Sequence, residues 1–354
     1  MVKLFRISME PMTVKKPLSS LLIKAGENPL ITPKTENFWE YFQTFNPGVI
    51  LLDGRVHFIY RAIGVDGVSR FGYASSRDGF HIDERLPYPV YEHRIVTHLT
   101  DNNPYASPSG GELYGAEDPR LVRIDGEPSL YMTYTVYDGR SLIRMALTSI
   151  SINDFLDKKW NWKPSVFISP EGETHKNWVI FPEKINGKYA ILYGISPEVR
   201  ISLLDDINIS KPINIIGRYN GIPIGKWKNG WEGYIRGVGP PPIKTEYGWL
   251  VFYHAHSRDD FARYKVGVML LDVKDPSRIL CKAKEPILEP TAQYENSGFK
   301  PGIIYVTGAI VKDGLLTLYY GSADSYVCAA YTDLKEFLET LIEESTVESS
   351  TGSH

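Results

Sequence analysis

The sequence predicts an all-β protein of five similar four-stranded units, and two features of its 354 residues carry this prediction. First, a unit recurs in which a small or polar residue, usually with a proline, precedes a strand, a glycine turn and an aromatic-rich strand. Its turn glycines recur roughly every 60 to 70 residues. Second, another pair of strand-like runs follows each unit. The two pairs together form a four-stranded sheet, which cannot bury both of its faces alone. We therefore expect a five-bladed β-propeller with a short C-terminal helix.

The first hairpin of each unit can be placed from its turn. Four turns pair an acidic or amide residue with glycine, which favours tight hairpins: Asp53-Gly54, Asp125-Gly126, Asn186-Gly187 and Asp313-Gly314. The fifth turn lies at Gly248. The blades are therefore expected to open near residues 45, 116, 179, 239 and 307.

The C-terminal segment differs from the repeats. After Asp333 the sequence reads LKEFLETLIEE, with apolar residues at helical spacing behind an N-cap aspartate. We expect one catalytic domain over residues 1–345 and a disordered tail or cloning remnant over 346–354.

Composition excludes several classes of function. The net charge is −3 and no long basic run occurs, which argues against a nucleic-acid partner. No 18-residue apolar stretch and no signal-peptide core are present, so a soluble, cytoplasmic protein without a membrane partner is expected. Neither the two cysteines nor the eight histidines show metal-ligand spacing, and no metal or other cofactor is expected.

Asp118 is the strongest candidate for chemistry. It opens the inner strand of the second unit in the run GAEDPRL, so it should lie at one end of the central channel. Pro119 disfavours helical backbone in the residue before it, and we expect Asp118 to be extended and able to direct a proton. A purely structural role, as a turn cap or as the partner of Arg120, remains an alternative.

Five ordered motifs carry a family resemblance: GAEDPRLVRIDG, FPEKINGKY, GPPPIKTEYGWLVFYHA, LLDVKDPSRIL and YYGSAD. Together they resemble glycoside hydrolase family 130, the mannoside phosphorylases and β-mannosidases, over residues 25 to 340. The resemblance implies inverting cleavage of a terminal β-linked mannose of an oligosaccharide, with Asp118 as the general acid. The sugar contacts that it implies are Asn46, Arg61 and Asp324, and Glu117, Arg120 and Glu183 are further substrate-binding candidates.

The phosphate site implied by the resemblance is incomplete. Lys176, Asn177 and His254 match the expected phosphate-binding positions, whereas Gly194 and Ile235 replace two expected cations. His175 and Arg236 are nearby substitutes. Two lost charge-assisted contacts would weaken phosphate binding by roughly two to four decades.

This departure favours water as the nucleophile, and hydrolysis is the leading expectation. Glu232 is the first candidate for the base and Glu198 the second. Two alternatives stay open: a phosphorylase that uses inorganic phosphate as co-substrate and releases α-mannose 1-phosphate, and a carbohydrate-binding propeller without turnover. The linkage, the acceptor sugar and any assembly of identical copies are left open.

Overall fold

The computed structural model describes residues 16–93, 110–139, 143–207, 216–217, 220–225 and 230–351. Its strands form five blades, each a meander that starts at an inner strand and runs outward, and a two-residue parallel pairing of β4 with β6 links the first two blades. The first blade contains β2 (Gln43–Leu52), β3 (Arg55–Ile63), β4 (Val68–Ser76) and β5 (Glu84–Arg85). The second contains β6 (Tyr114–Arg123), β7 (Ser129–Tyr137), β8 (Arg144–Ser151) and β9 (Val166–Phe167).

The other three blades follow the same order. The third contains β10 (Val179–Ile180), β11 (Tyr189–Tyr193), β12 (Val199–Leu204) and β13 (Ile222–Ile224). The fourth contains β14 (Tyr234–Val238), β15 (Ile243–Lys244), β16 (Trp249–His256), β17 (Lys265–Leu271) and β18 (Ile279–Lys282). The fifth contains β19 (Ile304–Lys312), β20 (Leu315–Ser322) and β21 (Tyr326–Asp333), and β1 (Ile23–Lys24) is its outer strand.

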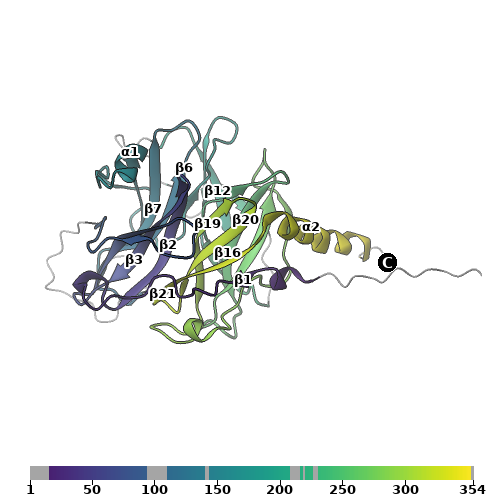
Figure 1. Cartoon of the computed structure of the whole chain (residues 1–354). Coiled ribbons are helices and arrows are strands. Elements are labelled where there is room, and N and C mark those ends of the chain that lie inside the picture. The colour runs from purple at the N-terminus through teal and green to yellow at the C-terminus, as the bar shows by residue number, and fades with distance from the viewer. Residues whose placement is uncertain are drawn as a thin grey trace, which may run out of the picture.

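The N-terminal strand β1 closes the ring. It pairs antiparallel with β21, through Ile23 opposite Tyr331 and Lys24 opposite Ala330. In Figure 1 the purple N-terminal segment accordingly runs beside the yellow-green strands of the last blade. The edge of β21, which would otherwise offer unpaired backbone groups, is thereby covered.

The hydrophobic core lies between the blades. The described buried apolar side chains form five clusters, and each lies between two neighbouring blades, including one between the fifth blade and the first. A five-bladed ring explains this arrangement, because each sheet buries both faces against its neighbours. Helix α2 (Leu334–Thr351) adds Phe337, Leu338 and Leu341 to the cluster between the fourth and fifth blades. The helix extends past residue 345, and residues 352–354 lie outside the described part.

The hairpin turns follow the sequence pattern at three positions. Asp53-Gly54, Asn186-Gly187 and Asp313-Gly314 each have positive φ at both residues, as a type I′ turn requires. At Asp125-Gly126 only the glycine has positive φ, at 80°, and five residues separate the end of β6 from the start of β7.

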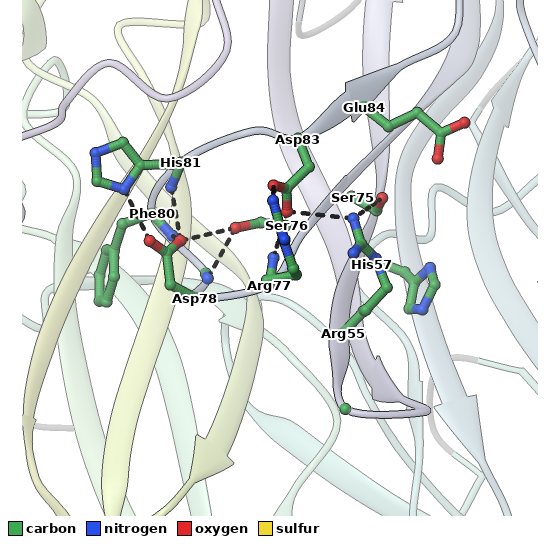
Figure 2. Close-up of polar contacts among 12 residues, drawn as sticks. Arg55, His57, Ser75, Ser76, Arg77, Asp78, Phe80, His81, Asp83 and Glu84 are labelled. Carbon is green, nitrogen blue, oxygen red and sulfur yellow. Dashed lines mark hydrogen bonds and ion pairs between the residues drawn. The ribbon is translucent and has the colours of Figure 1, made fainter.

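The turn between β4 and β5 shows how an outer hairpin is fixed (Figure 2). Asp78 accepts hydrogen bonds from Ser76 Oγ and from the backbone amides of Phe80 and His81, at 2.8 to 2.9 Å. Partial burial by itself would raise the pKa of Asp78, but these amides lower it well below its usual range. The carboxylate thus replaces backbone partners that the turn cannot supply.

Short helices complete the described part. They are α1 (Ile152–Leu156) and the 3-10 turns at Leu18–Ser20, Phe38–Glu40 and Gln293–Glu295. In the described residues no helix is both long and apolar enough to cross a membrane.

Candidate active site

Asp118 lies in a β-bulge at the inner strand of the second blade. The pairing of β6 with β7 shifts between Glu117 and Arg120, and Asp118 has a φ of 50°. The expectation of extended backbone was therefore wrong. Aspartate and asparagine tolerate the left-handed region better than most residues, and a bulge redirects a side chain that would otherwise lie on a sheet face.

Asn46 repeats this geometry in the first blade. It lies in a bulge between Phe45 and Gly48, has a φ of 44°, and donates from Nδ2 to Asp118 Oδ1 over 2.7 Å. A Cβ at Gly321 would lie 1.8 Å from Asn46 Oδ1, so the glycine of the YYGSAD motif makes room for this amide.

The contacts of Asp118 leave one oxygen for a ligand. Arg61 Nη1 also donates to Oδ1, over 3.0 Å, and no described side chain or amide hydrogen-bonds to Oδ2. Asp118 Oδ2 is therefore the atom that can exchange a proton with a bound sugar.

A buried ionic network holds Arg61. Its Nη2 lies 2.6 Å from Glu112 Oε2 and its Nη1 lies 3.5 Å from Glu117 Oε2. Glu117 Oε2 in turn accepts a hydrogen bond of 2.7 Å from Lys176 Nζ. Burial alone would lower the pKa of Arg61, but the carboxylates of Glu112, Glu117 and Asp118 raise it, so the guanidinium stays charged.

Asp324 faces the same pocket from the turn between β20 and β21. It has a φ of 48° and is 6% exposed. Its Oδ2 lies 3.5 Å from Lys300 Nζ. Burial raises the pKa of Asp324 to about 6, partly offset by Lys300 and Arg61. The group is thus ionised at neutral pH and gains a proton in mild acid.

One pocket at the mouth of the channel brings together six of the fourteen expected residues. It is lined by Asn46, Arg61, Asp118, Lys176, Arg236, Tyr264, Lys300, Ile303, Tyr305 and Asp324. These residues come from all five blades or the loops that enter them. The opposite mouth is lined by the far ends of the inner strands, including Val49, Leu121, Pro182, Ile243 and Ile310.

Arg236 is the pocket cation without a carboxylate partner among the described residues. Its Nε is buried and has no hydrogen-bond partner in the described part. Its guanidinium carbon lies 5.1 Å from the ring centre of Tyr264 and 5.8 Å from that of Tyr234. The aromatic rings hold the cation without neutralising it, so its charge remains available to an anion.

Arg120, Asn177 and His254 support the pocket from outside it. Arg120 donates to Asp118 O, Gly239 O and Asn177 Oδ1 over 2.6, 2.7 and 3.1 Å, so it ties three blades together. His254 is fully buried and stacks on Tyr305 with ring centres 4.0 Å apart. Burial, together with Arg120, lowers the pKa of His254 to about 3, and the ring is neutral. The position of His254 does not support the expected contact with phosphate.

His175 and Glu198 lie at a second cavity that shares Lys176 with the first. Its wall includes Thr174, His175, Lys176, Gly194, Glu198 and Arg200. Glu198 forms an ion pair with Arg200, and His175 Nε2 lies 2.8 Å from Glu173 Oε2. This cavity adjoins the Asp118 pocket, but Glu198 does not line that pocket.

Glu232 and Glu183 are placed away from the pocket. Glu232 lies 2.7 Å from Lys282 Nζ and accepts a hydrogen bond from Tyr253 Oη inside the fourth blade. Glu183 lies 2.6 Å from Lys244 Nζ, next to Pro182 at the opposite mouth. Neither glutamate lines the Asp118 pocket, so the structure gives no support to the expected roles of Glu232 as the base and of Glu183 as a sugar ligand.

Five residues of the site were not predicted from the sequence: Glu112, Tyr264, Lys300, Ile303 and Tyr305. Lys300 and Tyr305 flank the start of β19, and the repeat could have indicated them. Glu112 and Tyr264 lie in loops before β6 and β17. These loops differ in length between blades, so the repeat does not predict which loop residue faces the pocket. No group of three or more potential metal ligands occurs in the described ranges.

Comparison with known proteins places this geometry in a family. The family model described as β-1,4-mannooligosaccharide phosphorylase matches residues 26–343. A 1,2-β-oligomannan phosphorylase of Thermoanaerobacter sp. (strain X514) is 36% identical over 323 residues, covering 89% of this chain and 98% of the relative. A β-1,2-mannobiose phosphorylase of the same strain is 32% identical, with 87% and 96% covered.

A solved structure agrees with both the fold and the family. It comes from work on GH130 glycoside hydrolases that target β-1,2 mannosidic linkages in Candida mannan. Its TM-score is 0.70 at 26% identity, with 89% of this chain and 94% of that chain covered. The chain thus belongs to glycoside hydrolase family 130 and is an enzyme, a mannosidase or a mannoside phosphorylase.

Proposed function

We propose that this enzyme is an inverting phosphorylase that cleaves terminal β-1,2-linked mannose from manno-oligosaccharides, with inorganic phosphate as the co-substrate. Arg236 carries the proposal, because it is a cation without a carboxylate partner in the described part, in the same pocket wall as Lys176 and Asp118. Phosphate requires several charge-assisted donors. Three curated relatives, at 32 to 36% identity, are named as phosphorylases of 1,2-β-oligomannan or β-1,2-mannobiose, which supports both the nucleophile and the linkage.

This proposal reverses the preference for hydrolysis that the sequence suggested. That preference depended on the missing cations at Gly194 and Ile235, but Arg236 and Lys300 both line the pocket. An inverting hydrolase needs a second carboxylate about 6.5–9.5 Å from the acid to activate water. Asp324 is the other carboxylate among the described lining residues. It already forms an ion pair with Lys300 and is expected to bind the sugar, so it is a poor candidate for activating water.

The proposed reaction starts with the terminal mannose between Asp118 and Asp324. Asp118 Oδ2 supplies a proton to the glycosidic oxygen, directly or through a sugar hydroxyl, as the bond from that oxygen to C1 breaks. An oxygen of phosphate, held by Arg236 and Lys176, forms the new bond to C1 from the opposite face. The products are α-mannose 1-phosphate and a shortened sugar that carries the proton, and Asp118 regains a proton from solvent.

Product analysis tests the nucleophile. β-1,2-Mannobiose and β-1,4-mannobiose are incubated with and without inorganic phosphate, and mannose is separated from mannose 1-phosphate. We expect mannose 1-phosphate from the β-1,2 substrate and little turnover without phosphate. Mannose formed at the same rate in both conditions would establish hydrolysis instead.

A pair of arginine variants tests the anion site. Arg236→Ala should raise the KM for phosphate about 10- to 100-fold, the scale of one lost charge-assisted contact. Arg258→Ala is the matched control, because this neighbouring arginine is exposed and lines neither cavity. An unchanged KM in Arg236→Ala would remove this residue from the phosphate site.

A further inference from the structure

Arg236 lies against an aromatic stack that extends from the pocket wall to the surface. His256 is the middle ring, with its centre 5.2 Å from those of Tyr234 and Tyr264 and its plane inclined to theirs by 13° and 15°. The guanidinium carbon of Arg236 lies 5.8 Å from the ring centre of Tyr234 and 5.1 Å from that of Tyr264. Tyr264 lines the Asp118 pocket, whereas Tyr234 is 39% exposed. No step of the proposed reaction uses His256 or Tyr234.

Strand pairing fixes both Arg236 and His256 in this arrangement. Tyr234 on β14 is paired with His256 on β16, and the register shift between Ile235 and Gly237 makes Arg236 the extra residue of a bulge. Ile235 is buried in the apolar cluster between the third and fourth blades. Gly237 has a φ of 101°, and an added Cβ there would meet a backbone carbonyl oxygen at 2.9 Å. The bulge therefore directs Arg236, and not Ile235, toward the pocket.

His256 is held in place as firmly as a core side chain. It is 6% exposed, and its Nδ1 donates a hydrogen bond of 2.8 Å to Ser257 O. Because His256 separates the two tyrosine rings, it sets the positions of both rings that contact Arg236. A carboxylate partner would compete with phosphate for the charge of the arginine, whereas an aromatic ring attracts a cation without cancelling its charge.

We propose that His256 is a positioning residue for the phosphate site, which keeps Tyr234 and Tyr264 at the spacing that holds the Arg236 guanidinium in the pocket wall. The proposal rests on the phosphorylase function proposed above. If the stack were ordinary packing, loss of the His256 ring would lower stability and leave the affinity for phosphate unchanged. If the stack positions Arg236, the affinity for phosphate should fall.

The test compares two substitutions of the middle ring. His256→Leu removes the aromatic ring and should raise the KM for phosphate about three- to tenfold, the scale of one weakened cation–π contact. The kcat at saturating phosphate and the KM for β-1,2-mannobiose should change little. His256→Phe keeps a ring in the stack and should retain the wild-type KM for phosphate. His57→Leu is the matched control, because His57 is also buried beside aromatic rings but lines neither cavity.

A double variant tests whether His256 acts through Arg236. His256→Leu should add no further rise in the KM for phosphate when Arg236 is already alanine. An equal rise in both backgrounds would overturn the proposal, and so would a wild-type KM in folded His256→Leu. If His256→Leu does not fold, Tyr234→Leu removes an exposed ring of the same stack. The same rise is expected there, and an unchanged KM would refute the proposal.

The Nε–H resonance of Arg236 provides a measurement that needs no turnover. This nitrogen is buried and has no hydrogen-bond partner in the described part. Ring currents of the neighbouring tyrosines should displace its signal in a ¹H–¹⁵N spectrum, in which Arg236→Lys identifies it. We expect the displacement to persist in His256→Phe and to be lost in His256→Leu, and an unchanged signal in His256→Leu would contradict the proposal. Turnover without phosphate would refute the phosphorylase function, and this resonance would still test the stack.

Discussion

At the scale of single residues, the site depends on side chains at unusual backbone positions. Asn46, Asp118, Asn177 and Asp324 all have positive φ, between 44° and 63°. Short amide and carboxylate side chains occupy this region at lower cost than larger residues. The repeat indicates only that these positions are polar. The positive φ additionally explains why they hold asparagine or aspartate.

Asp118→Asn tests the general acid. Asparagine keeps the size of the side chain and its tolerance of the left-handed region, so the fold should persist. We expect kcat to fall about 10²- to 10⁴-fold, the usual contribution of proton transfer. Steady-state rates on β-1,2-mannobiose, with thermal melting as the folding check, measure this. Asp205→Asn, at an exposed carboxylate, is the control, and wild-type rates in Asp118→Asn would end the assignment.

Asp324→Asn tests the balance between stability and binding. Burial raises the pKa of Asp324 to about 6 in the folded state, above the value of about 3.9 in an unfolded chain. The ionised form therefore destabilises the fold, fully above pH 6 and no longer below about pH 4. We expect Asp324→Asn to be more stable than the wild type by about 1–3 kcal/mol at pH 8, with reduced affinity for mannosides.

Denaturant unfolding of the two proteins at several pH values checks this prediction. The difference in unfolding free energy should shrink as the pH falls from 6 to about 4. A constant difference over that range would mean that the carboxyl group of Asp324 is not the cause.

At the scale of elements, bulges and turns place the functional groups. The inner strands of four blades are irregular at corresponding places, between Phe45 and Gly48, Glu117 and Arg120, Ile235 and Gly237, and Val306 and Gly308. Each irregularity adds a residue that points away from the regular faces of its sheet. The channel mouth is therefore lined by polar side chains although the strands are apolar below it.

Asp78→Ala tests whether the turn after β4 stabilises the first blade. The carboxylate accepts hydrogen bonds from two backbone amides and from the Ser76 hydroxyl (Figure 2). Its loss should cost about 1 kcal/mol, as for other side chains that cap backbone amides. Urea unfolding measures the change, and Asp157→Ala, at a carboxylate whose ion pair in the described ranges is with Lys159, is the control. Equal effects of both substitutions would contradict a role for the turn.

At the scale of the whole molecule, the ring is closed by the first strand pairing with the last blade. Lys24 of β1 donates to Glu295 Oε2 over 2.5 Å, and the Glu295 side chain is fully buried. The contact fixes the N-terminal strand on the fifth blade. Closure therefore depends on a charged pair as well as on the apolar cluster between the first and fifth blades.

Lys24→Ala tests this closure. The change leaves a buried carboxylate without its cation, although Tyr320 and two backbone amides still donate to it. We expect a loss of about 2–4 kcal/mol in unfolding free energy. Lys265→Ala, which removes a partly exposed pair with Glu289, should cost at most about 1 kcal/mol. Similar losses in the two variants would show that β1 contributes little to closure.

The number of blades and their inner strands were predictable from local sequence, which also singled out Asp118 as the proposed acid. The hairpin turns and the Pro-containing strand entries are local signals, since glycine and proline restrict φ and ψ wherever they occur. These signals placed Asn46 and Asp118 at strand starts, and the family resemblance indicated Lys176, Arg236 and Asp324. The fold brings these five residues into one pocket.

Which charged side chains face the pocket and which are held in ion pairs elsewhere depends on contacts that form only in the folded chain. Glu232 and Glu183 looked equivalent to site carboxylates in the sequence, but Lys282 and Lys244 from other strands pair with them. The charge of Arg61 is fixed in the same way, because Glu112 and Glu117 from another blade raise its pKa. The charge state of a group depends on its distance to other charges and on its burial, and both are set by strands far apart in the chain.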